Sequence, residues 1–149
     1  SESSPMTTPP EHRPLLVELR PLIQPYHIDY ALHVNNAVYV RWLEDLRMEL
    51  LRRHCDARAL TEAGIAPVVA RTEISYLKPL RLFDEPEARM WCAEMGRATM
   101  TLEAEITVGG EAHTRAVQRV MMVNWKTERA ARVPEELRNA FAAAFPEGK

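Results

Sequence analysis

The chain has 149 residues, of which 46% are apolar and 27% charged, and its formal net charge is -2. This length fits one domain, and the composition is that of an ordinary globular protein. The near-neutral charge argues against nucleic-acid binding, because nucleic-acid-binding proteins usually carry an excess of basic residues. No apolar run approaches the ~20 residues of a membrane helix and no secretory signal pattern is present, so a cytoplasmic location without membrane contact is expected.

The two cysteines, Cys55 and Cys92, are expected to be reduced, because disulfides are uncommon outside secreted proteins. They also lack the clustered ligands that a zinc site shows. No metal site is therefore predicted.

Residues 1–13 are polar and rich in proline, without periodicity. This pattern predicts a disordered lead-in, followed by a single domain over residues 14–149. Apolar and polar side chains then alternate between residues 15 and 23, which predicts a first strand. Pro21 and Pro25 limit that strand to a sheet edge or end it.

A short polar loop, residues 26–35, leads directly into the one long amphipathic helix, predicted over residues 36–53. Its apolar side chains recur at i, i+4, i+7 and i+11 and form one stripe. The stripe consists of Tyr39, Leu43, Leu46 and Leu50, and the other side of the helix carries Arg41, Glu44, Asp45, Arg47 and Glu49. Asn35 or Asn36 is expected to cap the N-terminus of this helix.

From Pro67 onward the hydrophobic period changes to two, which predicts consecutive strands. They cover residues 68–76, 88–95, 98–108 and 112–125, and a short helix begins at Pro134. Strands joined by tight turns, such as the one at Gly109 and Gly110, must be antiparallel. Only the long helix can cover one face of their sheet. The expected fold is α+β, with a curved antiparallel sheet wrapped around a central helix and the strand order left open.

Asp29 is the sharpest candidate for chemistry, because the loop brings it towards the N-terminus of the long helix. The unsatisfied N–H groups and dipole at that end polarise an oxygen that becomes negative. A carboxylate beside such a site is equipped to hydrolyse an ester or thioester, as a general base or as a nucleophile. A purely structural alternative remains open, in which Asp29 forms an Asx turn, His33 is a loop hydrogen-bonder and Asn35 and Asn36 are caps.

The strongest family signal lies in this same loop and helix, in the motif Asp29-x-x-x-His33-Val34-Asn35-Asn36-x-x-Tyr39-x-x-Trp42-x-Glu44-x-x-Arg47. The motif resembles that of the hot-dog-fold thioesterases of the 4-hydroxybenzoyl-CoA thioesterase type, close to the bacterial acyl-CoA thioesterases. Residues 74–81 and 133–138 carry supporting similarity. The resemblance implies a five-stranded antiparallel sheet around one central helix, with a short C-terminal helix, and a dimer or homotetramer of paired strands.

The resemblance also assigns roles. It implies that Asp29 is the catalytic carboxylate, assisted by His33, and that the backbone N–H near Asn36 polarises the thioester carbonyl. Asn35 and Tyr39 are implied at a substrate pocket shared with a partner chain. Lys78, Arg81 and Arg97 are implied as contacts for the phosphates of coenzyme A, which enters as part of the substrate rather than as a cofactor.

Two positions depart from the family pattern: His27 stands where an aspartate is common, and Leu32 stands where glycine is common. Since glycine serves at positive φ or near a ligand, Leu32 is expected to reshape the pocket mouth or shift the backbone. The first hypothesis is therefore a thioesterase that cleaves acyl-CoA or an acyl-carrier-protein thioester. The alternative is a non-catalytic protein that binds acyl thioesters, its site closed by Leu32. A dehydratase of the same fold is disfavoured, because no suitably placed histidine and acid are found.

Overall fold

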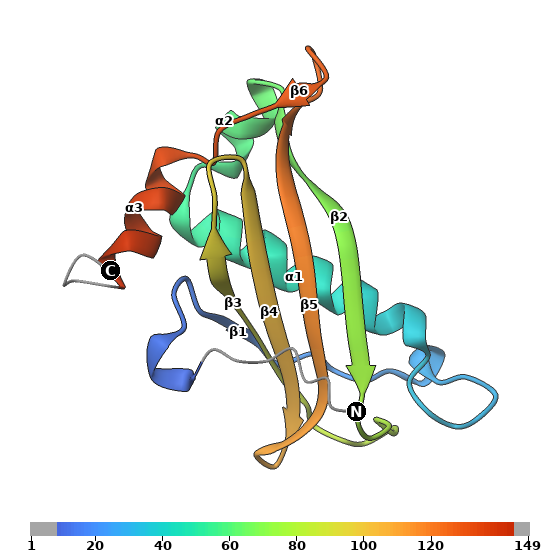
Figure 1. The fold of residues 1–149 in the computed structure, drawn as a ribbon. Helices are drawn as coiled ribbons and strands as arrows, with labels where there is room; N and C mark the ends of the chain where they lie inside the picture. The colour runs from blue at the N-terminus through green and yellow to red at the C-terminus, as the bar shows by residue number, and fades with distance from the viewer. Residues whose placement is uncertain (1–8, 145–149) are drawn as a thin grey trace.

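The computed structural model describes residues 9–144, which form a sheet curled around one long helix (Figure 1). In chain order the elements are η1 (Pro10–His12), β1 (Val17–Leu19), η2 (Pro25–His27), α1 (Asn36–His54), α2 (Ala57–Glu62), β2 (Ile65–Tyr76), β3 (Glu87–Met95), β4 (Thr99–Val108), β5 (Glu111–Asn124), β6 (Arg129–Ala130) and α3 (Glu135–Ala143). None of the helices within this described part has the length and apolarity needed to cross a membrane. The expected α+β fold with one central helix is confirmed.

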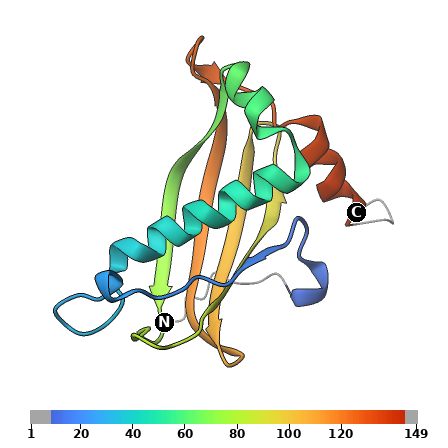
Figure 2. The same ribbon diagram turned by 180° about the vertical axis from the view of Figure 1, so that it is seen from behind.

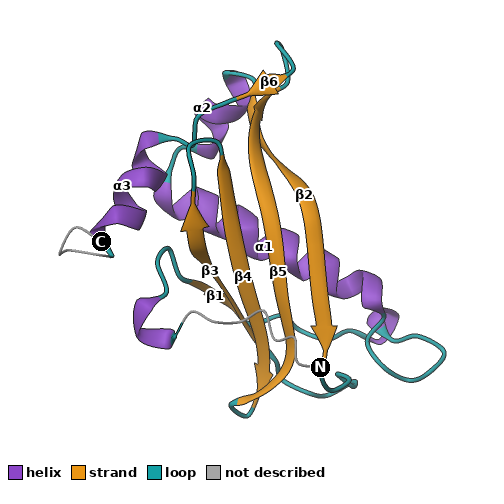
Figure 3. Cartoon of the chain, in the orientation of Figure 1, coloured by secondary structure: helices purple, strands orange, loops and turns teal. Residues whose placement is uncertain are grey.

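The strand order, which the sequence left open, is β1-β3-β4-β5-β2, with the short β6 paired to β5. All pairs are antiparallel. The chain crosses from one side of the sheet to the other through α1 and α2, so β2 joins the edge beyond β5 (Figure 3). At 12 residues β2 is long for an edge strand, and its outer edge has no pairing partner in the described chain. Edges of this length are usually covered by a partner or blunted by charge.

Helix α1 lies across the concave face of the sheet (Figure 2). Its buried side chains include the whole predicted stripe, and Leu46 and Leu50 are fully enclosed. Asn35 caps the helix, since its Oδ1 accepts a hydrogen bond of 2.8 Å from the backbone N–H of Ala37. The capping and the basic residues of its last turn agree with the charges that a helix dipole favours. The apolar stripe sets which side of α1 faces the sheet, and the Asn35 cap marks the end of the helix that adjoins the polar loop.

One residue of α1 departs from the predicted side. Arg47 is expected on the solvent-facing polar side, but its side chain is only partly exposed and donates a 2.8 Å hydrogen bond to Gln118 of β5. Residue 47 follows Tyr39 and Leu43 at steps of four, so it extends their row along the helix. A charged residue in such a row can face the sheet when a buried polar group there forms a hydrogen bond with it.

Two strand predictions also need correction. The alternation through β2 predicts Val68 and Thr72 on one face, but the register shifts between Val69 and Arg71. This bulge leaves Val68 47% exposed, and Val69 takes the inward position before the shift. One extra residue in a strand reverses the alternation beyond it.

The first strand, expected over residues 15–23, is only Val17–Leu19. Leu15 has a φ of 61°, which no strand residue adopts, and Pro21 removes a backbone donor after it. The structure also describes residues 9–13 of the predicted lead-in. Residues 10–12 form a 3-10 turn, and the guanidinium of Arg13 lies 3.8 Å from the ring centre of the buried Trp91. Residues 1–8 lie outside the described residues.

Candidate active site

The loop before α1 is a short hairpin closed by a β-bridge between Ile28 and Val34. Inside it the backbone N–H of Asp29 donates to the carbonyl of His33 at 2.9 Å, and the N–H of Leu32 donates to the carbonyl of Asp29 at 2.9 Å. Two further bonds hold the hairpin in place: Val34 N–H to the Leu80 carbonyl, and Asn35 N–H to the His27 carbonyl, both 2.8 Å. The loop is therefore tied both to the segment after β2 and to the turn before it.

The carboxylate of Asp29 is oriented by this loop. Its Oδ1 accepts hydrogen bonds from the backbone N–H of Ala31 at 2.9 Å and of His33 at 3.4 Å. The Asx turn that the sequence left open as an alternative is therefore present. It occupies only one carboxylate oxygen, since Oδ2 receives no hydrogen bond from the residues described. A structural role for Oδ1 thus leaves Oδ2 available for chemistry.

The first turn of α1 has an open donor. Ala37 N–H is capped by Asn35, and Val38 N–H donates to the Asn35 carbonyl at 2.9 Å. The N–H of Asn36, by contrast, has no acceptor within residues 9–144. A helix N-terminus with a free N–H favours a negative oxygen. Asn36 is therefore placed as the sequence predicted, although its role remains a prediction.

Tyr39 lies one turn further along α1 and is 2% exposed. Burial raises the pKa of its phenol; the neighbouring Leu80 backbone and Thr114 side chain oppose that rise, whereas the nearby Tyr76 and Asp29 add to it. The Tyr76 ring contacts Tyr39 edge-on at 5.1 Å between centroids.

Leu32 keeps the backbone that glycine would adopt there, with a φ of 66°, and its side chain is 71% exposed. The leucine therefore occupies a backbone conformation that suits glycine, and its effect on the pocket mouth stays a prediction. His27, which stands where the family commonly has aspartate, has local partners. Its Nδ1 accepts a hydrogen bond from the Gln24 N–H at 3.0 Å, and its ring packs edge-on against Trp42.

A substitution at Leu32 tests how much strain this conformation stores. The left-handed region costs an ordinary residue about 1–2 kcal/mol. Replacing leucine by glycine removes this strain, but the greater backbone entropy of glycine in the unfolded chain offsets part of the gain. We expect Leu32→Gly to leave the free energy of unfolding equal or raise it by up to about 1 kcal/mol. The matched variant Leu32→Val should lower it, because β-branched residues tolerate positive φ poorly. Urea unfolding of the three proteins measures the order, and a stabilising valine would contradict it.

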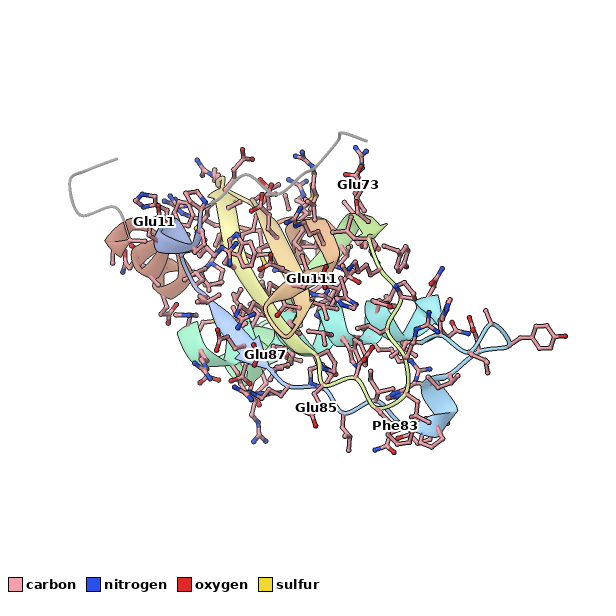
Figure 4. All side chains as sticks on the ribbon, turned by 90° about the horizontal axis from the view of Figure 1, so that it is seen from below. Glu11, Glu73, Phe83, Glu85, Glu87 and Glu111 are labelled. Carbon is pink, nitrogen blue, oxygen red and sulfur yellow. The ribbon has the colours of Figure 1, made fainter. Side chains whose placement is uncertain are left out.

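The predicted basic contacts separate into two groups. Lys78 forms an ion pair with Glu111, and Arg81 is exposed in the loop between β2 and β3. That loop lies at the same end of the molecule as the hairpin, because Leu80 bonds to Val34. Figure 4 looks onto this end, with Phe83 and Glu111 labelled. The segment also holds Phe83 at a φ of 85° with its side chain 89% exposed.

Arg97 lies elsewhere, in the turn between β3 and β4 at the opposite end of the sheet (Figure 1). The 9 residues of β3 separate the two ends by about 30 Å, at about 3.3 Å per residue. Arg97 lines a hollow of about 450 Å³ together with Arg132 and Arg138, which the sequence analysis did not single out. The structure does not bring Arg97 to the Asp29 loop of its own chain. Two hydrogen bonds join the segment around α3 to this turn: Val133 N–H donates to the Arg97 carbonyl at 2.8 Å, and Arg138 Nη1 donates to the Gly96 carbonyl at 3.4 Å.

No group of three or more histidine, cysteine or acidic side chains within the described chain could hold a metal ion. Both cysteines are free, as expected. Burial raises the pKa of Cys55 to about 11 and that of Cys92 to about 12, so neither carries thiolate at neutral pH. A cysteine nucleophile is therefore disfavoured.

Three comparisons place the chain among known proteins. The model of the thioesterase-like superfamily matches residues 23–141. Over 118 residues the chain is 29% identical to the long-chain acyl-CoA thioesterase FadM of Escherichia coli, an alignment that covers 78% of this chain and 89% of FadM. A thioesterase from Thermus thermophilus, solved in complex with coenzyme A and zinc, aligns with a TM-score of 0.75 and 26% identity, covering 88% and 94% of the two chains.

The fold extends to more distant proteins. A Staphylococcus aureus protein solved in complex with coenzyme A has a TM-score of 0.81 at 16% identity, over 92% of this chain and 88% of that one. The architecture is thus that of the hot-dog proteins, a curled antiparallel sheet around a long helix. The chain belongs to the thioesterase-like superfamily, and it is a thioesterase.

Proposed function

We propose that the enzyme hydrolyses the thioester of an acyl-coenzyme A, releasing a free carboxylic acid and coenzyme A. The observation that carries this proposal is the pairing of an oriented carboxylate with an open donor. Asp29 is fixed through Oδ1 and free at Oδ2, and the N–H of Asn36 has no acceptor within the described residues. The names of FadM and of the coenzyme A complex from Thermus thermophilus support the substrate class.

In this mechanism the thioester carbonyl oxygen accepts a hydrogen bond from Asn36 N–H, which stabilises the negative charge that develops there. Asp29 Oδ2 takes a proton from a water molecule whose oxygen attacks the carbonyl carbon. The carbon–sulfur bond then breaks, and the thiolate leaves and is protonated. Alternatively, Oδ2 attacks the carbon itself and water hydrolyses the resulting anhydride. His33 borders the carboxylate through its backbone and remains a predicted contributor.

The decisive experiment measures release of the free thiol from a panel of aliphatic and aromatic acyl-CoA thioesters and acyl-carrier-protein thioesters. We expect turnover of at least one acyl-CoA, with the carrier-protein thioester of the same acyl group slower. Binding of acyl-CoA without thiol release from any member would contradict the proposal.

We further propose that the enzyme works as a dimer, or a tetramer of dimers, in which the free edges of two β2 strands pair. The length of that unpaired edge supports this arrangement. Glu73 projects from the outer face of β2 rather than along its edge, so it does not block the approach of a second strand (Figure 4). Pairing two identical strands antiparallel creates a two-fold axis that reverses one sheet relative to the other.

The two-fold axis gives Arg97 a role. It brings the β3–β4 turn of one protomer to the end of the assembly that holds the Asp29 loop of its partner. We propose that Lys78 and Arg81 meet the coenzyme A phosphates of their own site, whereas Arg97, Arg132 and Arg138 meet those of the partner's site. The structure records no carboxylate within 4.0 Å of these last three guanidinium groups among residues 9–144, so they are open to phosphate.

The variant Arg132→Gln tests this shared site. We expect KM for the best acyl-CoA to rise on the order of tenfold, as for a lost hydrogen bond to a charged group, with kcat nearly unchanged. KM for the matching acyl-pantetheine, which lacks the nucleotide, should not change. Arg58→Gln, which removes an exposed ion pair on α2, is the control. An equal rise for both substrates, or a monomer in sedimentation velocity, would contradict the arrangement.

A further inference from the structure

The open edge of β2 carries two opposite charges on its outward face. Arg71 and Glu73 are two residues apart, so their side chains leave the strand on the same side. Both are exposed, and the structure records no ion pair for either one among residues 9–144. Within the described chain, β2 therefore presents an unpaired cation and an unpaired anion near the middle of its length.

The neighbouring strand makes the position of Arg71 electrostatically unfavourable. Arg71 lies directly opposite Arg119 of β5, whereas Glu73 lies opposite Val117. Like charges in directly opposite positions of an antiparallel pair destabilise the sheet. In the part of the chain that the structure describes, no acid forms an ion pair with either of these arginines. A carboxylate that approached from the open side of β2 would relieve the repulsion, so this edge favours a partner with an acid at that level.

One register of two β2 strands supplies such an acid from a second copy of this chain. When identical strands pair antiparallel, the residue numbers of opposite positions have a constant sum, and opposite side chains point to the same face. A two-fold axis at residue 71 sets Arg71 against its own copy, and an axis at residue 73 does the same for Glu73. An axis at Thr72 sets Arg71 against Glu73 of the partner subunit, and the symmetry makes this contact twice.

The inward side chains suit the same register. Thr72 points to the inward face, where its Oγ1 accepts a hydrogen bond from Gln118 Nε2 at 3.1 Å. An axis at this residue brings two Thr72 side chains opposite each other. Threonine pairs are among the favourable cross-strand pairs in antiparallel sheets.

The bulge in β2 keeps the faces matched over the rest of the contact. Ala70 has no partner on β5, and the alternation of faces reverses there. When this extra residue is passed over, Ile74 meets Val69 of the partner subunit, both on the inward face. Tyr76 then meets Pro67 of the partner subunit, and proline is tolerated on an edge strand. The matched contact extends from residue 67 to residue 76.

We propose that β2 of one protomer pairs with β2 of a second copy about a two-fold axis at Thr72, held in register by two reciprocal ion pairs between Arg71 and Glu73. The inference rests on the β2 pairing of the proposed function and adds its register. It is carried by three independent features of the strand: the two unpaired charges, the like-charge pair with Arg119 and the position of the bulge.

The register also names what the partner brings to the candidate site. Tyr76 contacts Tyr39 in the first turn of α1, with 5.1 Å between the ring centroids. Pro67 of the partner subunit lies opposite Tyr76 in this arrangement, and Val69 of the partner subunit follows it along the strand. The partner therefore borders the tyrosine pair with apolar side chains from the beginning of its own β2.

Mixing two charge variants tests the register. Arg71→Glu leaves two acids on the edge, and Glu73→Arg leaves two bases. Each variant alone should dimerise on the order of tenfold more weakly than the wild type, because both contacts become like-charge contacts. An equimolar mixture restores two opposite-charge contacts, so native mass spectrometry should show heterodimers well above the one half that random pairing gives. Arg71→Glu should fold, since it replaces the like-charge pair with Arg119 by an opposite-charge pair.

The matched control lies on the opposite edge of the sheet, where Glu18 and Arg20 are also exposed and two residues apart. Mixing Glu18→Arg with Arg20→Glu should give random pairing. A second measurement locates the axis directly. Under oxidising conditions Thr72→Cys should form a disulfide between protomers, whereas Ile74→Cys should not, because the residue on the axis meets its own copy.

Three results would overturn the proposal. Random pairing of Arg71→Glu with Glu73→Arg would remove the ion pairs, and a disulfide in Ile74→Cys instead of Thr72→Cys would move the axis. A monomeric wild type in sedimentation velocity would remove the β2 pairing itself. None of these measurements uses a substrate, so the proposed hydrolysis is decided separately by the release of free thiol from acyl-CoA.

Discussion

Asp29→Asn is expected to reduce kcat by about 10²- to 10⁴-fold, the usual contribution of a positioned general base, with KM little changed. Asparagine has nearly the same shape, and its Oδ1 can still accept from the Ala31 and His33 N–H groups that hold the loop. Its amide nitrogen replaces Oδ2 and can neither take a proton nor attack a carbonyl carbon. The loss therefore falls on the chemical step rather than on the fold of the hairpin.

Thiol release under saturating acyl-CoA measures this effect, and the matched control is Asp84→Asn. Asp84 also accepts from a loop N–H, that of Arg81, through its Oδ2 at 2.9 Å, but lies in the loop after β2. We expect the control to keep kcat within about twofold, because an asparagine at residue 84 can still accept from the Arg81 N–H and Asp84 has no part in the chemical step. A wild-type rate in Asp29→Asn would remove Asp29 from the mechanism, whichever substrate is used.

Much of the fold could be predicted because its signals are local. The long helix is expected over residues 36–53 and runs from Asn36 to His54, since its apolar stripe, cap and charged ends all lie within the segment. The turn at Gly109 and Gly110 has φ values of 59° and 83°, as a primed hairpin turn requires. The family resemblance then supplied the hot-dog architecture.

Strand order and the bulge in β2 were not predictable in this way. The position of β2 beside β5 depends on contacts between segments some fifty residues apart. The alternation of apolar and polar residues along each strand carries no information about such contacts. The shift between Val69 and Arg71 is visible only in the pairing with β5, because an extra residue leaves no mark in composition. Local sequence patterns predict whether a segment is a helix or a strand better than they predict which strands it pairs with.

The candidate site divides along the same line. Asp29 and Asn36 are close in sequence, so a single motif contains both, and the Asx turn expected of any loop aspartate orients the carboxylate. Thr114, Arg132 and Gln118 were missed because they reach the helix or the turn from distant elements. The solvent side predicted for Arg47 is wrong because charge was taken as a sign of exposure, whereas a buried amide on β5 receives it.

The largest expected change in stability is that of Leu46→Ala. Leu46 is fully buried beneath the sheet at the centre of α1, and truncating such a leucine leaves a cavity. The free energy of unfolding should fall by about 2–5 kcal/mol, which lowers Tm by roughly 5–15 °C for a chain of this size. Urea unfolding and calorimetry at fixed protein concentration measure it, because pairing of protomers would make Tm depend on concentration.

Met48→Ala is the matched control, since Met48 lies two residues along the same helix and is 42% exposed. Its cost should stay near about 0.5 kcal/mol. Leu46 is ten residues from Asn36, so kcat of folded Leu46→Ala at low temperature should equal that of the wild type. A variant that kept its stability but lost kcat would show that the position of α1, and with it the Asn36 donor, is set by this contact. The two measurements thus distinguish the contribution of α1 to stability from its contribution to the position of the Asn36 donor.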